Sequence, residues 1–257
     1  MTKDERTQIK KYFKYFPTWA VWMIIIGLPL LAVKYVGVIP IALGIWGIYS
    51  YYQKASDAQM DACIREDMKN LQTRALAKTG IDASEIVAEC VTVYGPRFWK
   101  IGGAEIGIKK GNDGVVRFMP IGVTVINFTA HQLVAYQCAL DLTTGNVLSE
   151  STDEYFYRDI VSVSTKSESR TYTQGEIGTE LPKGLLKGLM TDGKLQFNAA
   201  DMFVLTTSGG SRIEVVLRDP QLIKSAGGGS IPTEMADKAV QAVRKMLREK
   251  KIASASA

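Results

Sequence analysis

The chain has 257 residues, which is enough for one substantial domain or for one domain plus a smaller module. Its net charge is only +5 and is not gathered into a basic stripe over a domain face, which argues against a nucleic-acid-binding protein. Cys63, Cys90 and Cys138 are too few and too widely spaced for a disulfide framework or a CxxC ligand pair, so free thiols and a reducing compartment are expected.

The apolar residues concentrate in two adjacent segments, 17–33 and 35–52. A membrane span needs about 20 apolar residues, and flanking aromatic residues can extend both segments through the interfacial layer. The sequence therefore predicts a transmembrane helical hairpin over 17–53, behind a basic aromatic segment over 1–16. A re-entrant hairpin that never crosses is the alternative. The expected membrane anchor residues are Trp19, Trp22, Lys34, Trp46, Tyr49, Tyr51 and Tyr52.

Charge flanking the hairpin predicts its orientation. Five Lys or Arg residues precede it, five lie between Lys54 and Lys78, and only Lys34 lies at the turn. By the positive-inside rule, both termini and the remaining domain are expected in the cytoplasm, with the chain a multi-pass protein of the inner membrane. Glycines at positions 27, 44 and 47 would allow close packing of the two helices; the alternative is that glycine is simply common in membrane helices.

A linker helix is predicted over 54–80, ending near Gly80. It carries an apolar stripe at helical spacing on an otherwise charged surface. The stripe either packs on the chain's own domain or serves as an interaction stripe for self-association. Its residues are Met60, Ile64, Met68, Leu71 and Ala75.

The region 81–252 is predicted to be strand-rich, with a tail over 253–257. Alternating or continuous apolar runs predict strands, and Ser208–Ser211 predicts a hairpin turn. A final amphipathic helix is expected from Pro232. Antiparallel strands followed by one helix form an α+β plan, with a bent sheet or barrel closed by the helix. The predicted strands are 122–128, 134–142, 155–157, 160–165, 202–207 and 212–217.

The segments YFYRDIVSVST (155–165), LTTSGGSRIEVVL (205–217) and ADKAVQAVRKMLREKK (236–251) resemble the second half of a pleckstrin-homology-like (PH-like) domain of the bacterial membrane-associated type. The resemblance covers about half of the chain. The regions 166–194 and 85–118 depart from the family's pattern. The resemblance implies binding of a lipid headgroup or a partner protein rather than catalysis.

No catalytic, cofactor-binding or metal-binding residues are predicted. His131 is the only histidine and is interpreted as a strand-end residue. The glycines at 227–229 are interpreted as a linker, with an anion cradle as the alternative. Arg244, Lys245 and Arg248 form a candidate anion-binding surface.

The sequence thus favours a non-enzymatic, membrane-tethered sensor or scaffold whose partners are membrane lipid and a protein partner or a second copy, without a cofactor. The alternative is a membrane effector, or a subunit of a larger membrane assembly, whose hairpin oligomerises in the bilayer.

Overall fold

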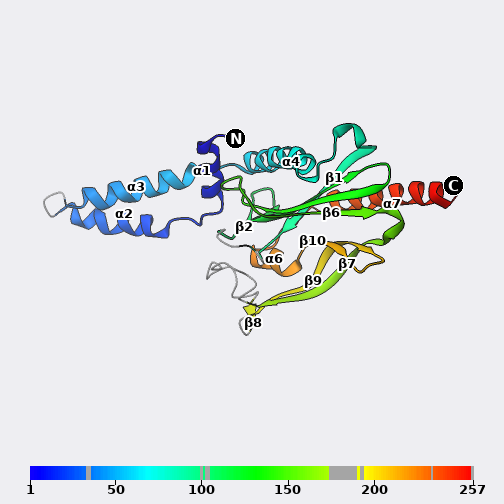
Figure 1. The fold of residues 1–257 in the computed structure, drawn as a ribbon. Helices are drawn as coiled ribbons and strands as arrows, with labels where there is room; N and C mark the ends of the chain where they lie inside the picture. Colours follow the sequence, from blue (N-terminus) through cyan, green and yellow to red (C-terminus); the bar gives the residue numbers. More distant parts are fainter. Residues whose placement is uncertain are drawn as a thin grey trace. The chain divides into compact units, whose positions relative to one another are not determined.

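The computed structural model describes residues 1–32, 36–98, 101, 105–173, 190–191, 194–232 and 234–255. The chain divides into two compact units, Met1–Cys63 and Ile64–Ala257. The first unit is helical and contains α1 (Lys3–Tyr12), α2 (Thr18–Leu30), α3 (Val38–Tyr52) and the first turns of α4 (Asp57–Thr79). Helices α2 and α3 form an antiparallel hairpin, drawn in blue in Figure 1.

The predicted transmembrane hairpin is wrong. In the described part of the chain, no helix combines the length and apolarity needed to cross a membrane. Helix α2 has 13 residues and α3 has 15, so each is about 20 Å long against a hydrocarbon core of about 30 Å. The multi-pass inner-membrane location and its cytoplasmic orientation, which rested on that hairpin, are therefore not supported.

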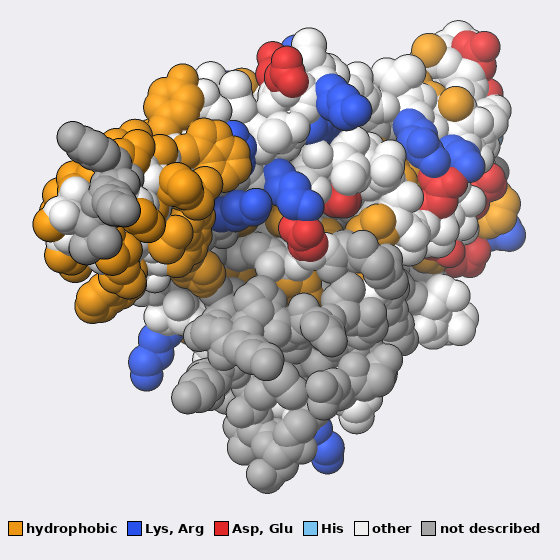
Figure 2. Space-filling model, turned by 90° about the vertical axis from the view of Figure 1, so that its left-hand side faces the viewer, with side chains coloured by type: hydrophobic (Ala, Val, Ile, Leu, Met, Phe, Trp, Pro, Cys, Tyr) orange, Lys and Arg blue, Asp and Glu red, His pale blue; other side chains and the backbone are white. Residues whose placement is uncertain are grey.

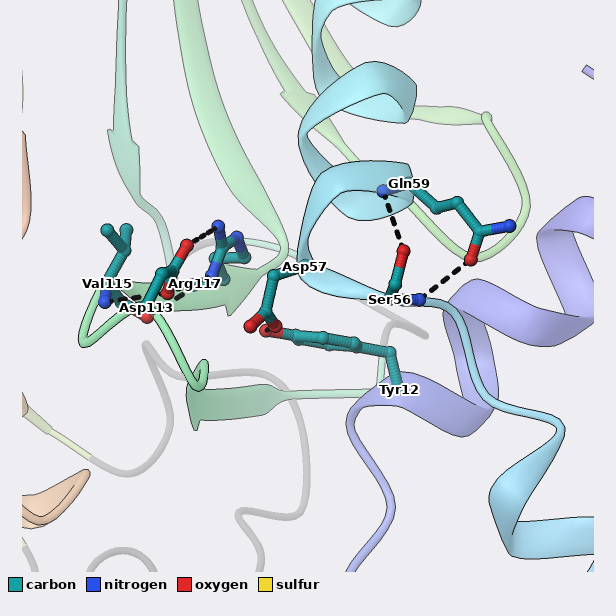
Figure 3. Close-up of polar contacts among 7 residues, drawn as sticks. All are labelled: Tyr12, Ser56, Asp57, Gln59, Asp113, Val115 and Arg117. Atoms are coloured by element: carbon teal, nitrogen blue, oxygen red, sulfur yellow. Dashed lines mark hydrogen bonds and ion pairs between the residues drawn. The ribbon is translucent and has the colours of Figure 1, made fainter.

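The chain around the hairpin explains why the helices are short. Residues 14–17 are not helical, so the aromatic residues before α2 do not lengthen it. Pro29 lies in the last turn of α2, and the last helical residue is Leu30. Beyond α3, Ser56 and Gln59 form a capping box: the Gln59 amide donates to Ser56 Oγ at 3.2 Å, and the Ser56 amide donates to Gln59 Oε1 at 2.8 Å (Figure 3). Helix α4 is consequently a separate helix and not a continuation of α3.

The second unit is built on antiparallel strands. One sheet has the order β1-β4-β5-β6, and a second has the order β10-β9-β7 with β8 beside β9. The strands are β1 (Ala88–Pro96), β2 (Gly107–Lys110), β3 (Val116–Met119), β4 (Ile121–Phe128), β5 (Gln132–Leu140), β6 (Val147–Phe156), β7 (Ile160–Thr173), β8 (Met190–Thr191), β9 (Lys194–Thr207) and β10 (Arg212–Arg218). Strands β2 and β3 pair with each other as a separate hairpin.

Two 3-10 turns and two helices complete the described part of this unit. They are the 3-10 turns η1 (Ala83–Glu85) and η2 (Tyr157–Asp159) and the helices α6 (Pro220–Ser225) and α7 (Glu234–Ala255). Gly80 ends α4 with a φ of +68°, as its position in the sequence predicts.

The core of the second unit lies between the two sheets. It contains Val93 of β1, Ile126 of β4, Phe203 of β9 and Val215 of β10, and Val243 of α7 is fully buried against them. Strands β1 and β10 lie against each other where the two sheets meet, and α7 packs on β1 and β7 (Figure 1). This arrangement places one face of the four-stranded sheet inside the core.

Helix α4 lies at the β1–β4–β5–β6 sheet, and the two central strands β4 and β5 are buried on both faces. Gln72 Nε2 donates to Thr92 Oγ1 of β1 at 3.0 Å. In β5, Ala135 belongs to the core, while its neighbours Val134 and Tyr136 point the other way and are also fully buried. The alternating pattern of 134–142 is typical of a strand with one solvent-exposed face, but Ala135 and Ala139, which alternate with the larger apolar residues, are also fully buried.

Candidate functional site

The α2–α3 hairpin packs through its smallest residues. A Cβ added at Gly44 would lie 2.5 Å from the Ala20 carbonyl oxygen, and one added at Gly27 would lie 2.6 Å from Ile41 Cγ1. At Gly47 an added Cβ would lie 2.9 Å from the Trp19 ring. The close approach of the helices that these glycines would allow is confirmed.

Because the small residues face inward, the large apolar residues of the hairpin face outward. Trp22 is 62% exposed and Trp46 is 64% exposed. Outside their mutual contact, both helices expose apolar side chains on successive turns, and neither has a polar face. The exposed residues are Trp19, Val21, Trp22, Ile25, Ile26 and Leu28 on α2, and Val38, Ile39, Leu43, Ile45, Trp46, Tyr49 and Tyr52 on α3. Figure 2 shows hydrophobic side chains massed on this part of the molecule.

This packing is the reverse of that in a water-soluble helical hairpin, which buries large apolar residues between its helices and exposes polar ones. A soluble protein rarely exposes a continuous apolar patch of more than a few hundred Å². The outward surface of α2–α3 is therefore the candidate functional site, a surface suited to apolar surroundings.

The base of the hairpin, where α2 begins and α3 ends, is tied to α1. The Ala55 amide donates to the Gln8 carbonyl at 3.2 Å, and the Tyr12 hydroxyl donates to Asp57 Oδ1 at 2.8 Å (Figure 3). The rings of Phe16 and Tyr51 meet edge to face, with centroids 5.3 Å apart. The last turns of α1, which include Lys11, thus lie at the same end of the hairpin as these aromatic residues.

The predicted anchor residues fall into three groups. Trp19, Trp22, Trp46, Tyr49 and Tyr52 are exposed on the hairpin, and Tyr51 is half-buried against Phe16 at its base. Lys34 lies outside the described residues.

The predicted interaction stripe is buried within the chain. Met60, Ile64, Met68, Leu71 and Ala75 are each exposed by 9% or less. In the second unit, Gln72, Arg74 and Lys78 hold α4 on the four-stranded sheet through their contacts with Thr92 and Glu150. The stripe residues Ile64, Met68, Leu71 and Ala75 of this helix are buried. These side chains are consequently not available for self-association.

The other predicted features have structural contacts. Arg244 donates from Nε and from its terminal nitrogen to the Val163 carbonyl at 3.2 and 3.0 Å, while Lys245 and Arg248 are exposed on α7. Near the glycine run 227–229, the Gly228 amide donates to the Ile223 carbonyl at 2.9 Å and the Ser230 amide to the Gly114 carbonyl at 3.0 Å. The glycine run therefore packs against the β2–β3 turn. Because the Gly228 and Ser230 amides donate to backbone carbonyls, they are not available to bind an anion.

The β2–β3 turn is itself held by an ion pair. Arg117, which is buried, donates to Asp113 Oδ2 at 2.6 Å, and the Val115 amide donates to Asp113 Oδ1 at 3.0 Å (Figure 3). These bonds, the one from Arg117 first, lower the pKa of Asp113 to about 2.

A polar cluster that the sequence did not reveal holds α4 on the sheet. Glu150 of β6 accepts from Lys78 Nζ at 2.5 Å and from the buried Tyr136 hydroxyl at 2.8 Å, and Arg74 adds a bond at 2.9 Å. The bond from Lys78 is the main cause that lowers the pKa of Glu150 to about 2. Burial raises the pKa of Tyr136, and it raises that of Cys138 to about 11. These shifts disfavour phenolate and thiolate, and the contacts of Arg74 and Lys78 with Glu150 hold α4 on the four-stranded sheet.

Replacing Glu150 with Gln is expected to lower stability at pH 7 by about 1 kcal/mol, because the carboxylate is partly exposed and screened. Its pKa is depressed in the folded state, so its contribution is present above a pH of about 4.5 and is lost as the pH falls toward about 2. Urea unfolding of both proteins across this range measures the difference. The control is Glu154→Gln, which removes another carboxylate of β6, one that accepts a hydrogen bond from Gln132 of β5. A deficit for E150Q that persists unchanged at pH 2 would contradict this assignment.

Among the described residues, no group of three or more His, Cys, Asp and Glu side chains is placed to hold a metal ion. Comparison of the chain with family models, with curated proteins and with solved structures finds no match. The candidate site therefore stands on the geometry of the hairpin and its base.

Proposed function

We propose that this protein is a non-enzymatic scaffold that attaches to a lipid layer by inserting the α2–α3 hairpin into one leaflet, without crossing it. The observation that carries the proposal is the reversed packing of the hairpin, with glycines inside and tryptophans outside. Hydrocarbon chains can surround such a surface on every side.

The uniform apolar surface favours lipid over a second protein as the occupant. A protein partner covers one face of a helix and leaves the opposite face polar, whereas both helices here are apolar all round. The same property disfavours a helix lying flat in the interface, which needs one charged face. Each helix is about 20 Å long, whereas the hydrocarbon of one leaflet is about 15 Å thick and that of both leaflets about 30 Å. This length fits a tilted hairpin that inserts from one side and does not cross.

Aromatic residues at the base support the same orientation. Tyr15 and Phe16 precede α2, and Tyr49 and Tyr52 end α3, and all four are exposed. Tyrosine and tryptophan prefer the boundary between headgroups and hydrocarbon, because one end of the side chain is apolar and the other is wet. With the base at this boundary, the hairpin turn points into the leaflet, and the second unit is left to present its surface to a partner.

The test is flotation of the full chain with vesicles of phosphatidylcholine. We expect the unmodified protein to float and a variant with Ile25→Asp and Ile45→Asp to lose about 100-fold or more in binding, because each charge in hydrocarbon costs roughly 3 kcal/mol. Both positions are more than 45% exposed, so the substitutions leave the internal packing of the hairpin intact. Val161→Asp, at an exposed apolar position on β7, is the matched control and should float normally.

A second copy of the chain is the competing occupant, and the same proteins decide between the two. If the unmodified protein ignores vesicles but forms oligomers that the double Asp variant cannot form, the hairpin is a protein interface and the proposal is wrong. The proposal also fails if the double Asp variant floats as well as the unmodified protein.

A further inference from the structure

We infer that the base of the hairpin is a binding site for anionic lipid headgroups, formed by Lys10, Lys11, Lys14 and Lys54. These four residues are called the basic collar below. The inference rests on the proposed insertion of the hairpin and adds the chemistry of the lipid that the protein selects.

Charge is completely segregated in this part of the chain. Residues 6–56 contain Arg6, the four lysines of the basic collar and Lys34, and they contain no Asp or Glu. Asp57, the first acidic residue beyond them, accepts a hydrogen bond from the Tyr12 hydroxyl. A stretch of this length with one sign of charge is complementary to an anionic surface.

The structure holds the basic collar at the base of the hairpin. Ile9 and Tyr12 are each only 2% exposed and fix α1 in place. Lys11 Nζ lies 3.4 Å from Gln53 Oε1, just beyond α3, which links the end of α1 to the end of the hairpin. Lys54 lies over the Tyr51 ring, with Nζ 4.3 Å from the ring centroid. Lysines from both sides of the hairpin therefore lie at the same end of it.

The apolar hairpin, the aromatic residues at its base and the basic collar follow one another in the same order as the hydrocarbon, the boundary and the headgroups of a lipid monolayer. Hydrocarbon contacts the outward residues of α2 and α3, the aromatic residues at the base occupy the boundary, and phosphate oxygens lie level with the lysines beyond it. Lysine suits a mobile layer of headgroups because its ammonium group is a compact charge on a flexible side chain. Unlike the planar guanidinium group of arginine, it does not require one fixed geometry of its partner. The favoured ligand is consequently a phosphate-bearing anionic lipid, bound through charge.

The experiment compares flotation with phosphatidylcholine vesicles and with vesicles in which 30% of the lipid is phosphatidylglycerol. Because each basic residue near an anionic surface contributes about 1 kcal/mol, three lysines correspond to a roughly 100-fold preference. We expect Lys10→Gln, Lys11→Gln and Lys14→Gln together to lower the preference for phosphatidylglycerol by this factor of about 100, with only the smaller share of Lys54 left, while binding to phosphatidylcholine stays unchanged. The corresponding Lys→Arg variant keeps the charge and should keep the preference. Lys245→Gln with Arg248→Gln, on α7, should also keep it.

Equal binding of the unmodified protein to both vesicle types would overturn the inference, and so would a triple Gln variant that prefers phosphatidylglycerol as strongly as the unmodified protein does. If millimolar inorganic phosphate displaces the protein from anionic vesicles more than chloride at the same ionic strength does, the ligand is a free phosphate and the inference is wrong. Failure of the proposed function has a different signature, because the unmodified protein would then not bind phosphatidylcholine at all.

Discussion

The full-length Val243→Asp variant should lose most of the stability of its Ile64–Ala257 unit. Val243 is fully buried in the middle of α7, against the core between the two sheets. A carboxylate at this position would be desolvated among apolar side chains, at a cost of roughly 4 kcal/mol or more. Since a domain of this size is stable by only about 5–15 kcal/mol, the variant should lose its cooperative unfolding transition or show it at a much lower temperature.

Circular dichroism and thermal unfolding of the full chain measure this effect. Gln241→Asp introduces the same side chain at an exposed position of the same helix and should change stability by no more than about 0.5 kcal/mol. An unfolding temperature for V243D within a few degrees of the unmodified protein would show that α7 does not seal the core.

The strands that the sequence predicted are those with a clear apolar pattern and a turn signal. The segments 122–128, 202–207 and 212–217 lie within β4, β9 and β10, and the turn at Ser208–Ser211 joins β9 to β10. These patterns succeed because a sheet face buried in a core requires apolar residues at every second position. The final helix is also found close to its expected start, at Glu234 instead of Pro232.

Other elements have sequence signals that are weak or conflicting. Strand β1 contains Glu89, Thr92 and Gly95, and strands β2 and β3 have only four residues each, so no period-2 pattern develops. In contrast, α1 was missed despite a readable signal: Thr2 and Glu5 have the spacing of a capping box, and the structure forms both of its bonds.

Burial of the α4 stripe and the shortness of the hairpin could not be deduced from periodicity. An apolar stripe shows that a helix face must be covered but does not identify what covers it, and here that face is buried within the chain. An apolar segment likewise shows which residues avoid water but not where the helix begins and ends. The non-helical residues before Thr18, together with the end of α2 at Leu30 directly after Pro29, set that length.

The contacts of Glu150 with Arg74, Lys78 and Tyr136 are a third feature that the sequence did not predict. Its residues come from α4, β5 and β6, and their positions in the sequence are as far as 76 residues apart. Ion pairs of this kind depend on tertiary placement, which no spacing in a single sequence encodes. The basic collar differs because its lysines flank the hairpin in sequence, and closing the hairpin brings them to one end.

Replacing Gly95 with Ala should destabilise the protein by about 3 kcal/mol or more. An added Cβ would lie only 1.7 Å from the Val216 carbonyl oxygen and 2.8 Å from the Val216 carbonyl carbon. These are backbone atoms, so they cannot rotate away as a side chain could. The only relief is to separate β1 from β10, which opens the junction between the two sheets and exposes the core behind it.

Urea unfolding of the full chain measures the loss, and Gly209→Ala is the matched control. Gly209 lies in the exposed turn between β9 and β10, has no neighbouring atom within 4 Å of an added Cβ, and does not have the positive φ of Gly210. G209A should therefore change stability by no more than about 0.5 kcal/mol. Equal stability of G95A and G209A would mean that β1 and β10 do not approach each other as closely as described. A large loss confined to G95A would establish that close backbone contact between these strands, and not side-chain packing alone, joins the two sheets.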